Sequence, residues 1–216
     1  TFVAVWPATL IRFVAPRHVL GFVKLWARMV LACARGICGI RVEVIGREHL
    51  PEGPALIASL HQSAFDTIVW LTLVPRCCYV MKKELRRIPL FGGLTHAAGM
   101  ITVDREAGAM AMRPLMRDGE KAIRDGRQIV IFPEGTRSEP GAALPLLPGV
   151  AALASRTGMP VIPVATDSGH YWGRRAFRKE AGVIRIIIRP PLPVGLRRED
   201  LMRQLAEALV LPRNSP

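Results

Sequence analysis

The chain has 216 residues, 50% of them hydrophobic, with 30 lysines and arginines against 17 aspartates and glutamates and a formal net charge of +13. This length suits one α/β domain with a sizeable core plus a short additional segment. The positive charge favours polyanionic partners: nucleic acid, an anionic membrane surface or a phosphate-bearing substrate. Two tyrosines and seven phenylalanines offer few rings for base stacking, and no zinc-finger, basic-zipper or RNP-like segment is present. Nucleic acid is therefore not an expected partner.

The four cysteines show neither the spacing of a metal site nor that of a disulfide framework. They are Cys33, Cys38, Cys77 and Cys78. No CxxC pair occurs, no histidine stands at a zinc-ligand distance, and a chain of this size does not need disulfide staples. We therefore expect no bound metal and a reducing, cytosolic setting.

Residues 1–39 differ in composition from the rest of the chain. Residues 2–14 (FVAVWPATLIRFV) are largely apolar, Pro16 interrupts the pattern, and residues 18–38 form a second apolar stretch with helical periodicity. Four basic residues in and just before this second stretch are seven, four and seven positions apart. At about 100° per residue they fall within about 40° of one another, so the helix has a narrow basic stripe. The residues of this stripe are Arg17, Lys24, Arg28 and Arg35.

These two amphipathic helices are predicted to lie in the headgroup layer of a membrane. A cleaved signal peptide is disfavoured because charges recur through the apolar region and no clear small-residue cleavage site follows. A membrane span is disfavoured because the uninterrupted apolar runs are shorter than the approximately 20 residues that cross a bilayer. Trp6, Trp26 and the basic stripe suit an anionic phospholipid surface, with peripheral or monotopic attachment at the cytoplasmic face of the cell membrane. A helical hairpin packed on its own domain is the alternative.

The rest of the chain alternates between strand-like and helix-like segments. Strands joined by helical crossovers predict an α/β fold, with a mainly parallel or mixed sheet and helices on both faces. The expected strands are residues 40–46, 55–60, 77–81, 100–104, 128–133, 160–166 and 182–190. The expected helices are residues 64–73, 108–126, 151–156 and 199–209. We therefore predict two parts, the membrane-interface helices over residues 1–39 and one α/β domain over residues 40–216.

The most informative stretch is LHQSAFDT (residues 60–67), in which His61 and Asp66 stand five positions apart. It follows a short buried strand and leads into a helix that Ser63 is suited to cap. His61 therefore lies in a tight turn at a strand end, where open α/β sheets place their ligands. With Asp66 in the first helical turn, its carboxylate can approach one imidazole nitrogen and leave the other facing a cleft. This is the base and orienting half of a catalytic triad, without a nucleophile of its own.

Two other interpretations of this stretch stay open. Ser63 and Asp66 have the spacing of a capping box, in which the aspartate only accepts the backbone N–H of its own N-cap. Ser63 itself could be proposed as a nucleophile, although its position suits capping better. The motifs of other catalytic families are absent: GxSxG, GxxxxGK[ST], GxGxxG after a strand, and HExxH.

Further stretches follow in the chain: VDR at residues 103–105, FPEGTRS at residues 132–138 and VIPVA at residues 161–165, with KKEL and IPLFG within residues 82–92. In this order, and together with HQSAFD, they resemble the sequence blocks of the glycerolipid acyltransferase family. The resemblance covers residues 40–209. HxxxxD alone is a weak signal, whereas HxxxxD followed by FPEGTR some seventy residues later is a strong one.

The resemblance implies transfer of a fatty acyl group from an acyl thioester, either acyl-CoA or acyl carrier protein, to the sn-2 hydroxyl of lysophosphatidic acid. The product is phosphatidic acid, in phospholipid biosynthesis. His61 is then the general base, Asp66 holds its tautomer, and no metal or redox cofactor is required. One alternative is an acyltransferase for another lysolipid, such as lyso-ornithine lipid. The other is a membrane-surface binding protein without turnover, which the intact His61, Asp66 and Glu134 disfavour because binding needs no base.

Substrate-binding residues are expected at the same edge of the sheet as His61. They are Arg105, Glu134, Gly135, Thr136 and Arg137. Gly135 permits close backbone approach to a ligand, and the backbone around it is a candidate to stabilise an oxyanion. Arg137 offers a planar fork that suits phosphate, and Arg105 is expected to complete a bidentate clamp on a phosphomonoester.

Two positions depart from the family pattern. Members commonly carry Asn before the motif histidine, where this chain has Leu60; the change alters how the turn is held but leaves the base in place. Many members also carry a lysine just before the Pro-Gly that follows the EGTR block, where this chain has Leu147. One phosphate contact is therefore expected to be missing, which places more of the contact on Arg105 and Arg137.

Overall fold

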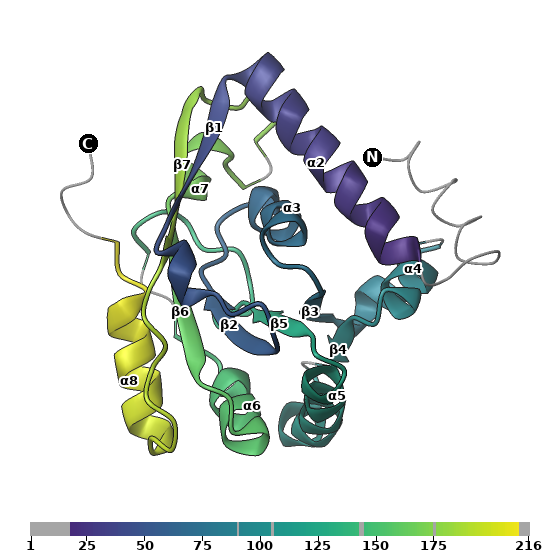
Figure 1. Cartoon of the computed structure of the whole chain (residues 1–216), viewed down its shortest axis with the longest axis vertical. Helices are drawn as coiled ribbons and strands as arrows, with labels where there is room; N and C mark the ends of the chain where they lie inside the picture. The colour runs from purple at the N-terminus through teal and green to yellow at the C-terminus, as the bar shows by residue number, and fades with distance from the viewer. Residues whose placement is uncertain (1–17, 90, 105, 143–144, 175, 212–216) are drawn as a thin grey trace.

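A computed structural model of the chain describes residues 18–89, 91–104, 106–142, 145–174 and 176–211 (Figure 1). The first expected N-terminal helix, residues 2–14, and Arg17 of the basic stripe lie outside the described residues. Over the described residues the centre of the molecule is a seven-stranded sheet with the strand order β1-β7-β6-β2-β5-β3-β4.

The sheet confirms the predicted α/β fold and is mixed. The parallel pairs are β1 with β7, β2 with β5 and β6, and β3 with β4 and β5, whereas β6 and β7 are antiparallel. The strands are β1 Ile40–Ile45, β2 Ala55–Ser59, β3 Cys77–Lys82, β4 Ile101–Val103, β5 Gln128–Ile131, β6 Val161–Thr166 and β7 Gly182–Ile188. All seven expected strands are therefore present among the described residues.

The direction of β7 follows from the segment that precedes it. A parallel neighbour requires a crossover, usually a helix long enough to return along the sheet. The connection from β6 contains only the four-residue α7, Ser168–Tyr171. The chain therefore turns back, and β1 and β7 run opposite to the other strands.

The central strands are buried on both faces because helices cover the sheet above and below. Every residue of β2, β5 and β6 is buried. Successive side chains alternate between the two faces. Ile57 and Val130 enter one hydrophobic cluster, and their neighbours Leu56 and Ile129 enter the other.

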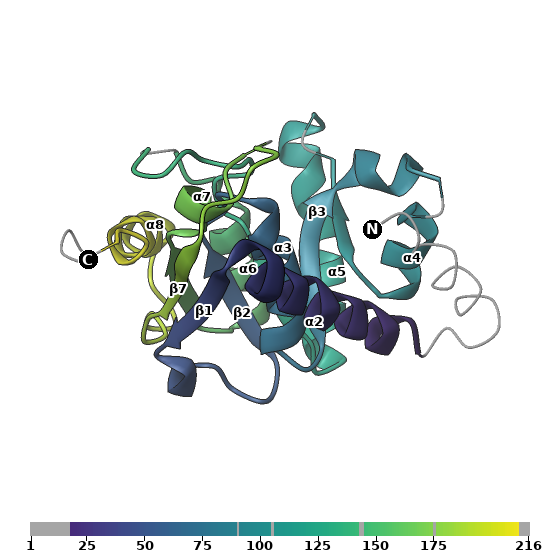
Figure 2. The same cartoon turned by 90° about the horizontal axis from the view of Figure 1, so that it is seen from above.

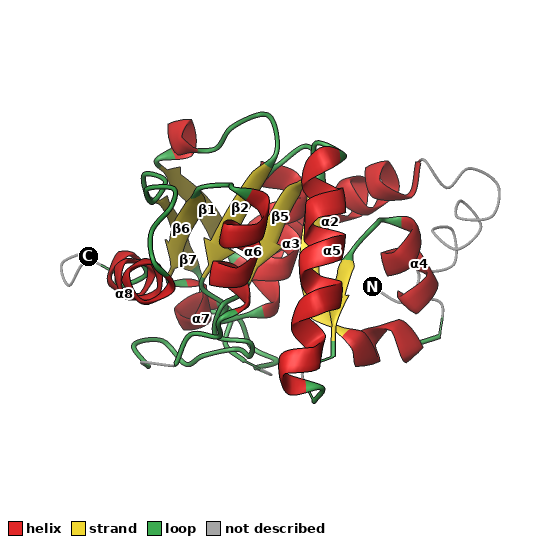
Figure 3. Cartoon of the chain, turned by 90° about the horizontal axis from the view of Figure 1, so that it is seen from below, coloured by secondary structure: helices red, strands yellow, loops and turns green. Residues whose placement is uncertain are grey.

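Helices α2 (Val19–Cys38) and α3 (Ala64–Leu73) pack in the first cluster, and α5 (Met112–Arg124), α6 (Gly149–Thr157) and α8 (Arg198–Ala208) pack in the second. Figure 1 shows the last three in a row on one side of the sheet, and Figure 3 shows them from below. Helix α4 (Phe91–Ala97) packs against the start of α2. Short 3-10 helices are η2 Arg47–His49, η3 Lys83–Arg87 and η4 Gly108–Ala111.

Two features differ from the sequence expectation. A single helix was expected over residues 108–126, but η4 precedes an α-helix that begins at Met112. Pro114 is the reason, because a proline lacks the N–H that a helix interior requires and is tolerated only in the first turn. The sequence reading also missed α4 and α7, which have only seven and four residues.

Helix α2 has one buried face and one exposed apolar face. Ala27 and Ala34 are buried against the core. Leu25, Met29 and Ile37 are 54%, 58% and 82% exposed. The helix therefore packs on the domain and also presents apolar side chains outward. In the part of the chain that the structure describes, no helix combines the length and apolarity needed to cross a membrane.

Candidate active site

The His61 turn lies between the end of β2 at Ser59 and the start of α3 at Ala64. β2 is flanked on both sides by parallel strands, β5 and β6. Leu60 continues the pairing, since its N–H donates to the carbonyl of Val164 at 2.9 Å. The turn is thus attached to the middle of the sheet, where its position is set by neighbours on both sides.

Asp66 both caps α3 and faces the histidine. Its Oδ2 accepts the backbone N–H groups of Gln62 and Ser63 at 2.7 and 2.8 Å, and it lies 3.3 Å from Nδ1 of His61. The Ser63 hydroxyl accepts the N–H of Phe65 at 3.0 Å and completes the capping box. The capping and orienting interpretations are therefore compatible, because one carboxylate oxygen serves both.

This geometry selects one tautomer of His61. A proton on Nδ1 donates to the Asp66 carboxylate and leaves the lone pair of Nε2 available as a base. The side chains of His61 and Asp66 are only 13% and 3% exposed, so water screens their interaction weakly. The pair can therefore accept a proton at Nε2 and stabilise the imidazolium that results.

An aromatic stack packs against one face of the His61 imidazole. The rings of His61 and Phe132 are stacked with centroids 4.2 Å apart and an interplanar angle of 23°. Phe132 in turn stacks on Tyr79 at 6.1 Å, and the Tyr79 hydroxyl donates to the carbonyl of Thr67 at 2.7 Å. The stack therefore connects the end of β5 to α3 and restricts rotation of the imidazole.

Glu134 connects the FPEGTRS loop to the backbone of His61. Its Oε2 accepts the N–H of His61 at 2.9 Å, and its Oε1 accepts the hydroxyl of Ser138 at 2.8 Å. The N–H of Ser138 donates to the carbonyl of His61 at 2.8 Å, so the turn is held at both its N–H and its C=O. Burial raises the pKa of Glu134 from 4.5 to about 7, although the bonds from Ser138 and His61 oppose the shift. Glu134 does not line the cavity described below, and both of its oxygens are bonded within the protein.

The residues after Glu134 form the polar wall of the site. Gly135 has φ 70°, a left-handed conformation that other residues rarely adopt, and its N–H donates to the carbonyl of Phe132 at 3.0 Å. The N–H of Gly135 therefore already has an acceptor within the protein and is not free to bind a substrate oxygen. The amides of Thr136 and Arg137 have no acceptor among the described residues.

The sequence expectations about phosphate contacts involve Arg105 and Leu147. Arg105 lies outside the described residues, so its expected part in a phosphate clamp stays a prediction. Leu147 donates its N–H to the carbonyl of Pro133 at 2.7 Å, next to Glu134, and its side chain is 44% exposed. An apolar side chain therefore stands beside the polar loop.

A cavity of about 590 Å³ extends from this polar wall between α2, α3 and α4. At one end it is lined by His61, Gly135, Thr136, Arg137 and Arg174. Most of the remaining lining is apolar and includes Phe22 and Trp26 of α2, Ile68 and Leu71 of α3, and Leu94 of α4. The site therefore combines a basic end that contains His61 with a largely apolar compartment.

Sequence reasoning missed three residues of this site. Ser138 lies within the FPEGTRS segment, but only the fold shows that it binds the His61 backbone. Arg174 and Tyr79 belong to no motif that the sequence reading used. In the described part of the chain, no group of three His, Cys, Asp or Glu side chains is placed to hold a metal ion.

Comparison with known proteins gives the family. The model of the family named Acyltransferase matches residues 41–167, which is more than half of the chain. The chain belongs to this acyltransferase family. It is 35% identical to a 1-acyl-sn-glycerol-3-phosphate acyltransferase of Pseudomonas aeruginosa, over 95% of this chain and 83% of that protein.

Two further comparisons show lower sequence identity. The human 1-acyl-sn-glycerol-3-phosphate acyltransferase alpha is 30% identical over 81% of this chain and 63% of its own length. The chain thus spans slightly less than two thirds of that relative. A crystal structure of the 1-acyl-sn-glycerophosphate (LPA) acyltransferase PlsC of Thermotoga maritima matches with a TM-score of 0.73 at 24% identity, over 96% of this chain and 84% of that one. At this identity the structural likeness shows a shared fold.

Proposed function

We propose that this acyltransferase moves a fatty acyl group from an acyl thioester, acyl-CoA or acyl carrier protein, to the sn-2 hydroxyl of lysophosphatidic acid, giving phosphatidic acid. The observation that carries the proposal is the His61–Asp66 pair, which borders a cavity with a basic end and an apolar body. The names of the Pseudomonas and mammalian relatives support the same acceptor.

In the proposed reaction His61 acts as the general base. Nε2 takes the proton of the acceptor hydroxyl while its oxygen attacks the carbonyl carbon of the thioester. Asp66 stabilises the imidazolium, the carbon–sulfur bond then breaks, and the imidazolium returns its proton to the leaving thiolate. This sequence needs no redox cofactor, because attack, proton transfer and departure of sulfur leave oxidation states unchanged. We propose that it also proceeds without a metal.

The tetrahedral intermediate requires donors for its negative oxygen. We assign this role to the backbone amides of Thr136 and Arg137, because the N–H of Gly135 is bonded to Phe132. Both residues line the same end of the cavity as His61. Gly135, in a left-handed conformation, immediately precedes these two amides and lines the same cavity.

The apolar body of the cavity is proposed to hold the fatty acyl chain. Its volume of about 590 Å³ lies within the roughly 300–1,000 Å³ of small-molecule pockets. Helices α2 and α4 form much of this compartment. The segment proposed to touch the membrane therefore also forms part of the proposed acyl site.

We further propose that the enzyme attaches to the surface of an anionic membrane through α2. Leu25, Met29 and Ile37 form an exposed apolar face, and Arg28 and Arg35 lie beside it and are exposed. Reversing both arginine charges should weaken binding to anionic vesicles, most strongly at low salt.

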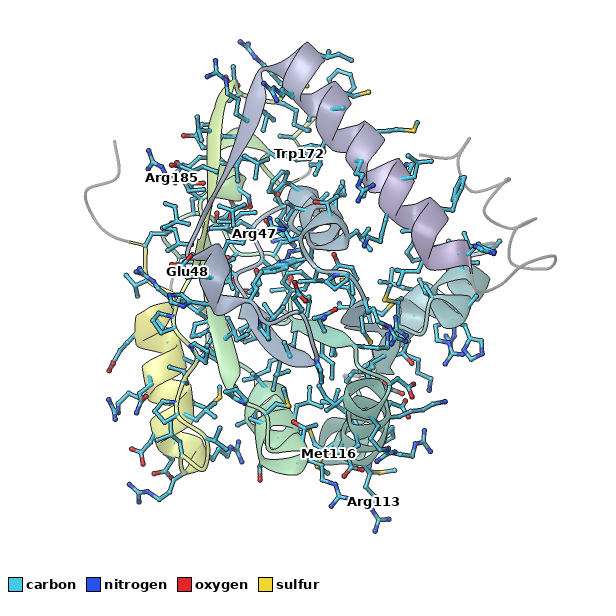
Figure 4. All side chains as sticks on the ribbon, viewed as in Figure 1. Arg47, Glu48, Arg113, Met116, Trp172 and Arg185 are labelled. Carbon is cyan, nitrogen blue, oxygen red and sulfur yellow. The ribbon has the colours of Figure 1, made fainter. Side chains whose placement is uncertain are left out.

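The matched control for this binding experiment reverses Arg113 and Arg117 of α5, which covers the opposite face of the sheet (Figure 4 labels Arg113). Unchanged vesicle binding in the α2 variant, or an equal loss in the α5 variant, would argue for α2 as an ordinary packed helix.

The deciding experiment for the reaction is a thioester-release assay with long-chain acyl donors and a panel of lysolipids. We expect release that depends on lysophosphatidic acid and disappears in His61→Ala. Release that requires lyso-ornithine lipid instead would replace the acceptor in the proposal. Vesicle binding without release from any acceptor would indicate a binding protein and contradict the proposal.

A further inference from the structure

Arg174 lies at the polar end of the cavity although it belongs to none of the motifs. It follows α7 and lines the cavity together with His61 and Arg137. Because β6 is parallel to β2, the chain leaves β6 at the edge of the sheet where His61 leaves β2. Figure 2 shows α7 and the loop after it at the same edge as the loop that precedes α6, and that loop begins with the FPEGTRS segment.

The charges of Arg174 and Arg137 are not neutralised within the part of the chain that the structure describes. Nη1 of Arg174 donates to the carbonyl of Arg137 at 3.5 Å, so the two residues are in contact. Among the described residues neither forms an ion pair with a carboxylate. Asp66 and Glu134, the acids of this site, are bonded to the His61 turn instead. Two adjacent cations without a counter-charge favour an anionic ligand.

The loop that carries Arg174 is tied to the domain on both sides of it. The N–H of Glu180 donates to the carbonyl of Tyr171 at 2.9 Å and closes the base of the loop. Trp172, labelled in Figure 4, lies against Phe65 of α3 with ring centroids 6.3 Å apart. The start of the loop is therefore fixed to the helix that Asp66 caps, which sets the position of Arg174 relative to His61.

We propose that Arg174 joins Arg137, which the sequence already assigns to phosphate, in binding the phosphate monoester of the acyl acceptor. The proposal rests on the proposed function, since it takes the acceptor to be lysophosphatidic acid. In this lipid the phosphate oxygen is attached to the carbon next to the one that carries the reacting hydroxyl. A phosphate held by both arginines therefore keeps that hydroxyl near His61. The two guanidinium groups come from separate loops, and each offers a planar fork to phosphate.

A phosphate at this position has two possible sources. The acceptor carries a phosphate monoester, and an acyl-CoA donor carries phosphates on its nucleotide part. We assign the site to the acceptor because both arginines share the end of the cavity with the base. The two sources are separated by measuring the KM of each substrate and by using an acyl-pantetheine donor, which has no phosphate.

The kinetic test compares Arg174→Ala and Arg174→Lys with Arg178→Ala as the matched control. Arg178 is on the same loop, pairs with Glu180 at 3.5 Å and does not line the cavity. We expect Arg174→Ala to raise the KM for lysophosphatidic acid about tenfold or more, with either donor and a smaller change in kcat. Lysine should restore only part of the loss, and Arg178→Ala should resemble the wild type.

Three outcomes would overturn the proposal. The first is an unchanged acceptor KM in Arg174→Ala. The second is a rise confined to the KM of acyl-CoA that disappears with acyl-pantetheine, which would assign the phosphate to the donor. The third is an equal effect of Arg178→Ala, which would indicate only the general charge of the loop.

A binding measurement separates this proposal from the proposed function. Inorganic phosphate should raise the melting temperature of the wild type and of Arg178→Ala, but not that of Arg174→Ala or Arg137→Ala. If the wild type fails to acylate lysophosphatidic acid yet shows this pattern, the proposed function fails and the phosphate site stands. If the wild type acylates the lipid and phosphate stabilises all variants equally, the site fails and the function stands.

Discussion

The His61 turn and the arginine rim border the same end of one cavity but are constructed in opposite ways. In the turn, Asp66 is 3% exposed, and its Oδ2 accepts two backbone N–H groups while facing the imidazole. At the rim, Arg137 and Arg174 are at least partly exposed and have no carboxylate partner among the described residues. The proposed base is held rigidly, and the arginines proposed to bind phosphate are left available.

This difference matches the roles proposed for the two regions, proton transfer for the turn and phosphate binding for the arginines. Proton transfer fails when the base is misplaced by about 1 Å, so the base needs a buried and fully bonded support. Recognition of a phosphate by long cationic side chains tolerates movement, because charge attraction falls off gradually with distance. Substitutions in the turn should therefore lower kcat, and substitutions at the rim should mainly raise KM.

The largest effect is expected from His61→Ala. Loss of a general base typically lowers the rate about 10²- to 10⁴-fold, while the fold should persist because the Asp66 cap of α3 remains. Single-turnover thioester release and circular dichroism measure the two effects. A folded variant with near-normal turnover would disprove the assigned base.

Asp66→Asn tests whether capping and orientation are separable. The amide keeps an oxygen for the backbone N–H groups of Gln62 and Ser63 but loses the charge that stabilises the imidazolium. We expect turnover to fall about 100-fold, with a stability change of about 1 kcal/mol or less. Chemical denaturation and kcat are measured on the same preparation. Lost stability with normal activity per folded molecule would leave Asp66 as a cap only.

Arg137→Ala should show the opposite kinetic signature. Removing a charged phosphate contact should raise the KM for lysophosphatidic acid about 10- to 100-fold and change kcat less. Arg203→Ala is the control, because Arg203 is an exposed residue of α8 that pairs with Glu207 far from the cavity lining. A fall confined to kcat would place Arg137 with the chemistry and remove the contrast between the two regions.

Glu134→Gln is expected to have the smallest effect on turnover, and its clearest signal is in stability. Burial raises the pKa of Glu134 from 4.5 to about 7, so between these values the folded chain binds more protons than the unfolded chain. The stability of the wild type should therefore fall as pH rises through this range, by up to about 3 kcal/mol.

Glutamine removes this pH dependence, because its amide does not titrate. Its oxygen can still accept the N–H of His61 and its NH₂ group can donate to Ser138. The Ser138 hydroxyl lies 3.3 Å from the His61 carbonyl and can turn to donate to it. Unfolding curves at pH 5 and pH 8 measure the change. The same pH dependence in both proteins would show that Glu134 is not the titrating group.

Much of the architecture is determined by local sequence patterns. Alternating and continuous apolar runs located every expected strand of the described sheet, and α3 begins and ends at the expected residues, Ala64 and Leu73. The His61–Asp66 pair could also be predicted from the sequence, because the strand end, the turn, the cap and the first helical turn lie within a few residues. These features depend on backbone periodicity and short-range bonding, which the sequence contains directly.

Other features were decided only by the tertiary structure. The direction of β7, the inward orientation of Glu134 and the position of Arg174 all depend on which loops the strand order brings together. His61 and Glu134 are 73 positions apart, and Arg137 and Arg174 are 37 positions apart. No local pattern specifies such contacts, because they arise when parallel strands deliver distant loops to one edge of the sheet. The sequence therefore determined the proposed catalytic pair, and the assembled sheet decided what supports that pair and which charges stand beside it.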